Sequence, residues 1–261
     1  MDLNLKGKTA LVCGSTQGIG KACALELAGL GARVILMARN TEALEEVLKE
    51  LDTISRQIHG FLVADFSNPG QVKDAIQSFV KGNPVHILVN NTGGPPGGPA
   101  ESAPAEEFTK AFSAHLLCNH HLMQAVVPGM KSKQYGRIIN IISTSVKQPL
   151  KGLGVSNTVR GAVANWSKTL AGELGRYGIT VNNVLPGATL TGRLSSIIET
   201  RAGKEGLSKD EISRHFLEEI PMGRFGNPEE IAAAVAFLAS PAAAYINGIN
   251  LPVDGGRTGC L

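Results

Sequence analysis

The sequence predicts an α/β fold in which helices cover both faces of a doubly wound parallel sheet. Segments typical of strands alternate with segments typical of helices along the whole chain, and such alternation favours a parallel sheet. The length of 261 residues suits one α/β domain and allows a large apolar core. Because no internal repeat or linker interrupts the alternation, residues 1–261 are expected to form a single domain.

The expected elements follow one another at short intervals. Strands are expected at 9–13, 33–37, 60–64, 85–89, 136–142, 179–185 and 250–253, where apolar residues run together. Helices are expected at 21–30, 41–51, 71–81, 106–130, 156–174 and 229–238. The prolines and glycines of 95–104 predict an exposed loop without helix or strand. The charged segment 188–226 predicts a helical insertion, the usual place for a mobile lid.

A glycine-rich turn follows the first expected strand. Glycines at 14, 18 and 20 leave no side chain between the backbone and whatever lies in the turn. Amide groups at a helix start favour an anion, so a strand, turn and helix in this order hold a pyrophosphate. Helix-opening turns that bind nothing also contain glycines, but the position in a βαβ unit favours a dinucleotide site. The expected cofactor contacts in this turn are Gly14, Ser15, Gln17, Gly18, Ile19 and Gly20.

The end of the second expected strand indicates which dinucleotide binds. An NAD site usually places an acidic residue near this point to hold the ribose 2′-hydroxyl, whereas an arginine accommodates a 2′-phosphate. The acidic residue is absent here and Arg39 is present. The alternative is an arginine that is merely solvated at a strand end. Arg39 therefore favours NADP(H) over NAD(H).

Polar residues also follow the third and fourth expected strands. Asp65, next to Phe66, either contacts the adenine or caps the helix that Asn68 introduces. Asn91 follows the fourth strand, where an amide side chain is able to hold both the central sheet and a cofactor ribose. These positions extend the predicted cofactor site across the carboxyl edge of the sheet.

Composition argues against several classes of partner. The net charge is +3 and the basic residues are scattered, which gives no support for a nucleic-acid or membrane partner. The four cysteines form no CxxC pair, and His120 and His121 lack a third ligand, so no metal site is expected. The first residues do not have the pattern of a signal peptide, and no apolar run is long enough to span a membrane. A cytoplasmic protein is expected.

Motifs in a fixed order give the whole chain a family resemblance. They are Gly14-x-x-x-Gly18-Ile19-Gly20, Asp65, Asn90-Asn91-Thr92-Gly93, Gly136-Arg137-Ile138-Ile139-Asn140-Ile141, Ser143, Gly178-Ile179-Thr180-Val181-Asn182, Pro186-Gly187 with Thr189 and Thr191, and Asp254-Gly255-Gly256. The chain resembles the short-chain dehydrogenase/reductases, in the branch that includes 3-oxoacyl-acyl-carrier-protein reductases. The resemblance implies a Rossmann-type fold of about seven strands, NAD(P)(H) binding and often a homo-oligomer, a tetramer or a dimer. It adds Gly93, Pro186, Gly187, Thr189 and Thr191 to the expected cofactor contacts.

The resemblance fails at the catalytic positions. Family members use a serine, a tyrosine thirteen residues later, a lysine four residues after that, and an asparagine on the preceding long helix. Ser143 matches the serine, but Ser156 stands at the tyrosine position and Arg160 at the lysine position. Counting back from Pro128 places His115 where the asparagine is expected. Only one of the four positions is therefore retained.

These replacements remove the usual proton donor. The tyrosine exchanges the alcohol proton and the lysine lowers its pKa, whereas a serine hydroxyl is too weak an acid at neutral pH. Arg160 does not accept a proton but holds a ribose or an anionic substrate group as a fork of donors. One helical turn separates positions 156 and 160, so both side chains are expected to point into the cleft. His115 has an ordinary pKa near 6.5, which suits proton transfer.

Three functions remain open on the sequence. In the first, the protein is an oxidoreductase of small carbonyl or alcohol substrates, with Ser143 polarising the substrate oxygen, Ser156 adding a hydrogen bond and His115 or water carrying the proton. In the second, it binds NADP(H) without redox activity, as a sensor or an inactive partner in an oligomer. In the third, Arg160 grips an anionic substrate for lyase-type chemistry, an elimination or aldol cleavage. Arg160 alternatively serves only as a clamp on the cofactor ribose.

Overall fold

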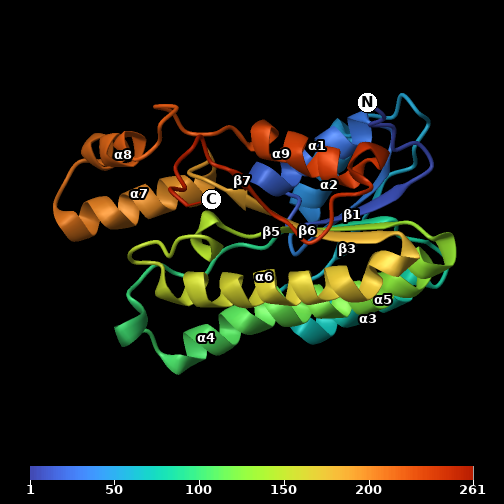
Figure 1. Cartoon of the computed structure of the whole chain (residues 1–261), viewed down its shortest axis with the longest axis horizontal. Coiled ribbons are helices and arrows are strands. Elements are labelled where there is room, and N and C mark those ends of the chain that lie inside the picture. The colour runs from blue at the N-terminus through green and yellow to red at the C-terminus, as the bar shows by residue number, and fades with distance from the viewer. Residues whose placement is uncertain (261) are drawn as a thin grey trace.

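A single parallel sheet forms the centre of the molecule (Figure 1). The structure, a computed structural model, describes residues 1–260. The strands are β1 (Thr9–Cys13), β2 (Arg33–Ala38), β3 (Gly60–Val63), β4 (Ile87–Asn90), β5 (Gly136–Ile141), β6 (Ile179–Pro186) and β7 (Asn250–Val253). They lie in the order β3-β2-β1-β4-β5-β6-β7, and every neighbouring pair is parallel. The prediction of a doubly wound parallel sheet of about seven strands is confirmed.

Helices cover both faces of the sheet. The α-helices are α1 (Gly18–Gly29), α2 (Thr41–Glu50), α3 (Pro69–Val80), α4 (Ala105–Phe112), α5 (Cys118–Lys133), α6 (Gly154–Leu174), α7 (Gly192–Glu205), α8 (Lys209–Glu218) and α9 (Pro228–Ala239). Figure 1 shows α1, α2 and α9 on one face and α3, α5 and α6 on the other, with α7 and α8 at one end. Chain order reverses between β1 and β4, the position at which open α/β sheets bind ligands beyond their carboxyl ends.

Alternating side chains of each inner strand enter two separate cores. In β1, Ala10 and Val12 pack in the cluster that holds α1, α2 and α9. Leu11 and Cys13 pack in the cluster that holds α3, α5 and α6. Both faces of the strand are thus buried, which explains why a strand of this kind reads as a continuous apolar run rather than an alternating one.

An unbroken series of asparagine side chains crosses four strands at one level of the sheet. Asn90, Asn140, Asn183 and Asn250 are neighbours in register on β4, β5, β6 and β7. Each Nδ2 donates to the Oδ1 of the next asparagine, at 2.8, 2.9 and 2.8 Å in turn. The second proton of the Asn140 amide goes to Ser167 Oγ on α6 at 3.2 Å. Because a slip of one residue would break every bond in the series, the asparagines fix the register of these strands.

The long helix expected at 106–130 is divided. A π-helical turn, η2 (Ser113–Leu117), separates α4 from α5, and His115 lies within it. Such a turn widens the helix locally and often occurs at functional sites. The expectation of one continuous α-helix is therefore wrong over five residues.

The glycine- and proline-rich loop has more structure than expected. It contains a short 3₁₀ turn, η1 (Ala100–Ser102), and its Gly98 bonds through both backbone groups to Gly152 and Gly154. A Cβ atom on Gly154 would lie 2.4 Å from the Ala100 nitrogen. The prediction of a loop without helix is corrected by this turn, whereas the expected exposure is confirmed at most of its positions. Glycine at 154 lets the loop lie directly against the start of α6.

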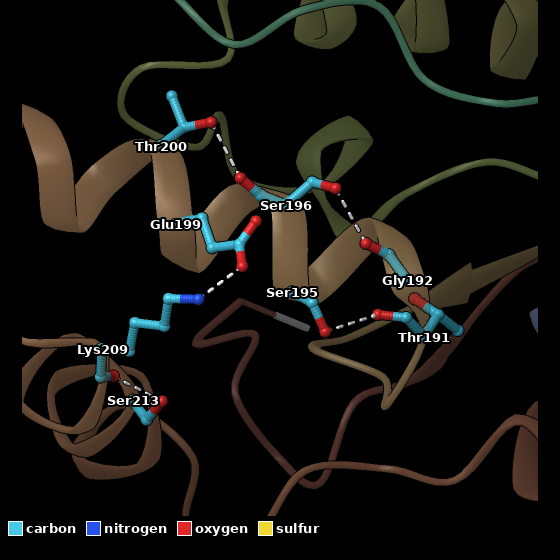
Figure 2. Close-up of polar contacts among 8 residues, drawn as sticks. All are labelled: Thr191, Gly192, Ser195, Ser196, Glu199, Thr200, Lys209 and Ser213. Carbon is cyan, nitrogen blue, oxygen red and sulfur yellow. Dashed lines mark hydrogen bonds and ion pairs between the residues drawn. The ribbon is translucent and has the colours of Figure 1, made fainter.

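The insertion at 188–226 is helical and has a small core of its own. It holds α7 and α8, whose buried Leu194, Ile198 and Ile212 pack together. Figure 2 shows Lys209 of α8 beside Glu199 of α7, with 2.5 Å between Nζ and Oε1. The two ends of the insertion meet, since Leu190 N–H donates to the Gly226 carbonyl at 2.8 Å and Gly226 N–H donates to the Ala188 carbonyl at 3.0 Å.

Across residues 1–260, no helix is both long enough and apolar enough to cross a membrane. Within the same part of the chain, no group of three or more histidine, cysteine or acidic side chains is arranged to hold a metal ion.

Removing the central member of the asparagine series should destabilise the fold. Asn140→Ala leaves the Asn90 amide donor and the Asn183 amide oxygen without partners in a buried setting. A loss of about 3 kcal/mol in the free energy of unfolding is expected, since each buried polar group left without a hydrogen-bond partner costs about 1–3 kcal/mol. Urea unfolding followed by circular dichroism measures it. Asn165→Ala, at an exposed position of α6, is the matched control and should change stability by less than about 0.5 kcal/mol.

Candidate active site

The glycine-rich turn between β1 and α1 is built for close backbone approach. A Cβ atom on Gly14 would lie 2.5 Å from the Asn91 carbonyl oxygen, and one on Gly20 would lie 2.1 Å from the Gly14 carbonyl oxygen. Gly14 and Gly18 also have positive φ angles of 58° and 52°, which side chains rarely adopt. The sequence therefore needs glycine at these positions to make the turn at all.

The amide groups at the start of α1 are free to meet an anion. Gln17 precedes the helix, its side chain makes no capping bond, and the first turn holds no acidic residue. Uncapped N–H groups and the helix dipole together favour a negatively charged ligand. These features, with the absence of side chains at Gly14, Gly18 and Gly20, fit the pyrophosphate of a dinucleotide.

Two neighbours hold the turn in place. Asn91 Nδ2 donates to the carbonyl oxygens of Cys13 and Gly14, at 3.3 and 3.1 Å. Ser15 is fully buried, and its Oγ accepts a hydrogen bond from the Met37 N–H at 3.0 Å. Ser15 thus connects the turn to β2 through its side chain, a structural role that the sequence did not indicate. Asn91 links the end of β4 to the same turn.

The start of the insertion lies against the glycine turn. A Cβ atom on Gly18 would lie 3.1 Å from Thr191 Cγ2, and Thr191 caps α7 through the Leu194 N–H. An open hollow of about 310 Å³ lies here, lined by residues that include Gly18, Lys21, Leu190, Thr191, Gly192 and Glu229. Thr189 Oγ1 bonds to the Gly187 carbonyl at 3.1 Å, just after the end of β6. The segment from Pro186 to Thr191 thus reaches the predicted pyrophosphate site. Gly93, which is also expected to contact the cofactor, is exposed after the end of β4.

Arg39 and Asp65 follow neighbouring strands, β2 and β3. Arg39 is exposed, as a contact to a 2′-phosphate requires. The pKa of Asp65 is held below its usual range by the hydrogen bond from the Ser67 N–H, with a smaller contribution from the charge of Arg39. Asn68 caps α3, its Oδ1 accepting from the Gln71 N–H at 3.2 Å. The alternative in which Asp65 caps this helix is therefore wrong.

Phe66, next to Asp65, lies on the side of the sheet that packs against α3 and α5. Its ring contacts the apolar cluster there, and its carbonyl oxygen accepts a hydrogen bond from Cys118 Sγ at 3.4 Å. Its place beside Asp65 keeps it at the adenine end of the predicted cofactor site.

Arg160 lies buried where the ends of β4 and β5 meet α6. Its Nη1 donates to the Ile141 carbonyl at 3.0 Å and its Nη2 to the Thr92 carbonyl at 3.3 Å. Thr92 Oγ1 also makes a short hydrogen bond to Nδ1 of His115, which is 2% exposed. Residues from two strands, the π turn and α6 therefore form one polar cluster. Thr92 was missed as a site residue, although its place in the Asn90–Gly93 motif was the available signal.

The buried cluster alters both charged groups. Burial, and then the charge of Arg160, lower the pKa of His115 to about 2. The expectation of a pKa near 6.5 is wrong here, because the imidazole is enclosed beside a cation. Burial, and then the charge of Arg193, lower the pKa of Arg160 to about 10, so the guanidinium stays charged at neutral pH. The cluster thus holds a neutral histidine and a buried cation.

The two serines remain available to a ligand. Ser143 Oγ accepts a hydrogen bond from the Ser145 N–H at 3.1 Å, which leaves its own proton to be donated. Ser156 is half-buried one helical turn before Arg160, and its hydroxyl makes no hydrogen bond within residues 1–260. The structure brings His115 and Arg160 together and places Ser143 two residues beyond the Ile141 carbonyl that Arg160 holds.

The chain matches a known protein family over nearly its whole length. The family model described as enoyl-(acyl carrier protein) reductase matches residues 14–258. The chain belongs to the short-chain dehydrogenase/reductase family of oxidoreductases. It is 36% identical over 257 residues to the 3-oxoacyl-[acyl-carrier-protein] reductase FabG of Vibrio cholerae, covering 97% of this chain and 98% of the relative.

Other members of the short-chain dehydrogenase/reductase family are similar over nearly all of this chain. A chloroplastic tropinone reductase homologue of Arabidopsis thaliana is 34% identical over 261 residues, covering 98% of this chain and 77% of the relative. The L-sorbose reductase of Gluconobacter frateurii, solved with NADPH and L-sorbose, has a TM-score of 0.92 at 30% identity, with 100% of both chains covered. The glycine turn, the uncapped α1 and the segment after β6 fit the nicotinamide dinucleotide of this family.

The low pKa of His115 predicts a loss of stability in acid. An unfolded histidine takes up a proton below about pH 6.5, whereas His115 in the folded protein stays neutral down to about pH 2. The unfolded state binds the extra proton between these values, so the free energy of unfolding falls as pH falls. Between pH 7.5 and pH 5, the wild type should lose about 2 kcal/mol more than His115→Asn in urea unfolding.

The same experiment carries its own control. His86 and His121, whose pKa values burial also lowers, are present in both proteins, so their contributions cancel in the comparison. An identical pH dependence of the two proteins would contradict a neutral, buried His115.

Proposed function

We propose that this protein is an NADP(H)-dependent oxidoreductase that interconverts a carbonyl and an alcohol without a tyrosine and lysine pair. The observation that carries the proposal is the arrangement at one sheet edge. A dinucleotide cradle at Gly14 to Gly20 lies beside a site that holds a free serine hydroxyl, Ser143, and a buried cation, Arg160.

NADP(H) is favoured over NAD(H) on the evidence of β2. No acidic residue stands at its end, and Arg39 is exposed there beside Asp65. A 2′-phosphate is a strong acceptor for an arginine, and an arginine at this place is typical of NADP sites. The related L-sorbose reductase was solved with NADPH, and the similar YwfH is described as an NADPH-dependent reductase.

Bound NADPH supplies the hydride, and the residues of this chain prepare the substrate. Ser143 donates a hydrogen bond from its hydroxyl to the substrate oxygen and keeps its proton, since its own oxygen already accepts from the Ser145 N–H. Ser156 adds a second hydrogen bond from α6. The positive charge of Arg160, fixed by two backbone carbonyls, stabilises negative charge as it develops on that oxygen.

The proton reaches the substrate from water in this proposal. With a pKa of about 2, His115 carries no spare proton at neutral pH. The imidazole instead shares a hydrogen bond with Thr92 Oγ1. This bond holds Thr92, whose backbone carbonyl accepts from Arg160. His115 is therefore a positioning residue, and its earlier role as proton carrier is replaced by solvent.

A second candidate is a binding protein without redox activity. It is favoured by one observation, that Ser156 and Arg160 leave the site without a group of near-neutral pKa at the positions of the family's tyrosine and lysine. Such a protein would bind NADPH with full affinity and oxidise none of it. The two candidates share the cofactor site and differ only in turnover.

Removing the Ser143 hydroxyl should slow the reaction. Purified protein is mixed with NADPH and a panel of charged and neutral carbonyl compounds, and the nicotinamide absorbance is followed. Ser143→Ala should lower kcat/KM about 100-fold, the usual cost of one donor to a developing oxyanion. Ser132→Ala, exposed near the end of α5, should leave the rate unchanged. No turnover by wild type, with NADPH bound tightly in a fluorescence titration, would favour the second candidate. Activity gained by Ser156→Tyr/Arg160→Lys would then show what is missing.

Arg39 should determine the choice of nucleotide. Arg39→Asp removes the partner of the 2′-phosphate and supplies an acceptor for a ribose hydroxyl. The Kd for NADPH should rise about 10- to 100-fold and that for NADH should fall, because a charged hydrogen bond contributes about 1.5–3 kcal/mol. Fluorescence titration measures both constants. Arg176→Gln, exposed before the amino end of β6, is the control. Equal affinities of wild type for the two nucleotides would contradict the role given to Arg39.

A further inference from the structure

Arg193 occupies an unfavourable place for a cation. It is the second residue of α7, directly after Gly192, and the first turn of this helix contains no acidic residue. The amino end of a helix carries partial positive charge, so an arginine there is repelled and an acid is preferred. A cation in such a position indicates that something other than helix stability keeps it. Arg193 is not among the residues expected at the site, although its place after the Thr191 cap was an available signal.

Arg193 reaches from the insertion to the loop that follows β4. Its Nη2 donates to the Pro95 carbonyl at 2.6 Å, and a Cβ atom on Gly94 would lie 3.4 Å from the same nitrogen. Arg160 donates to the Thr92 carbonyl at 3.3 Å. Two guanidinium groups, one from α6 and one from α7, therefore bind the same short segment, 92–95, at the edge of the site.

Within residues 1–260, the two arginines have no acidic partner. Ion pairs occur elsewhere in residues 1–260, but none of them includes Arg160 or Arg193. Both pKa values are lowered by burial, and the charge of Arg193 contributes to that of Arg160. Two neighbouring cations without a counter-ion repel each other. Each Nη of Arg160 donates one hydrogen bond to a carbonyl and only Nη2 of Arg193 does so, and since a guanidinium has five N–H donors, part of each fork remains unused.

We propose that Arg193 and Arg160 together hold an anionic group of the substrate, a carboxylate or a phosphate. The substrate is then a small oxo acid, a hydroxy acid or a phosphorylated carbonyl compound. An anion between the two forks would relieve their repulsion, and planar guanidinium groups match the geometry of both anions. The choice of substrate class rests on the proposed redox function, but the anion site itself does not.

The test compares charged substrates with matched neutral ones. Pyruvate and acetoacetate are assayed with NADPH beside their methyl esters, and glyceraldehyde 3-phosphate beside glyceraldehyde. The preference in kcat/KM for at least one anion over its neutral form should be about 100-fold in wild type. Arg193→Gln should reduce that preference at least tenfold, mainly through KM, and Arg193→Lys should restore part of it. Arg201→Gln, on the same helix and paired with Glu205, is the control and should keep the wild-type preference.

A binding measurement separates the anion site from the redox function. Oxamate, inorganic phosphate and neutral acetamide are added to the NADP⁺-saturated protein, and thermal unfolding is followed. A rise in Tm with oxamate or phosphate in wild type, lost in Arg193→Gln and absent with acetamide, supports the anion site even if no carbonyl is reduced.

Three outcomes would contradict the anion site. If acids and esters, or phosphorylated and free aldehydes, are reduced equally well, the anion site is wrong and the redox function stands. If Arg193→Gln lowers both members of each pair by the same factor, Arg193 only fastens the insertion to the loop. If no anion changes the Tm and no carbonyl is reduced, both the anion site and the redox function fail.

Discussion

The alignment of the carboxyl ends of β4 to β7 is the constraint on which the site depends. The asparagine series from Asn90 to Asn250 holds these strands at one level, and Asn91 joins the same edge to the glycine turn. The Thr92 and Ile141 carbonyls that hold Arg160 follow directly from that alignment. A cofactor cradle and a polar cluster that come from distant parts of the chain are thereby kept on one edge of the sheet.

The site differs from the family pattern mainly in where charge and protons lie. The pair at 156 and 160 combines a hydroxyl that does not ionise at neutral pH with a cation that does not deprotonate. Burial also keeps His115 neutral. Under the proposed function, these groups stabilise negative charge on a substrate and the proton comes from solvent.

Features that depend on local sequence could be predicted, and those that depend on tertiary neighbours could not. The glycine turn and the strands follow from residue type and spacing within a few positions. The pKa of His115 depends on enclosure beside Arg160, which lies 45 residues later in the chain. Ser15 stays a predicted cofactor contact because it lies in the turn, but the bond of its hydroxyl to the Met37 amide of the next strand was not indicated by the local sequence.

The same distinction explains the errors outside the site. The π turn around His115 leaves no mark in a helical pattern of apolar residues. The close contact between Gly154 and Ala100 joins a loop to a helix about fifty residues away, so composition alone did not indicate this packing or the 3₁₀ turn of the loop. Arg193 and Thr92 lie next to residues that were assigned from motifs, and only their contacts distinguish them from ordinary flanking positions.

The insertion between β6 and α9 has a small apolar core of its own. Its first and last segments are joined by an isolated β-bridge between Thr189 and Gly226. Further contacts fasten the insertion to the rest of the chain, since the Met222 N–H donates to the Gly255 carbonyl at 3.2 Å and Glu219 pairs with Arg257. The bond from Arg193 to the Pro95 carbonyl therefore links the interior of the insertion to the loop after β4, so that a change in the packing of Ile198 against Ile212 acts on the edge of the candidate site.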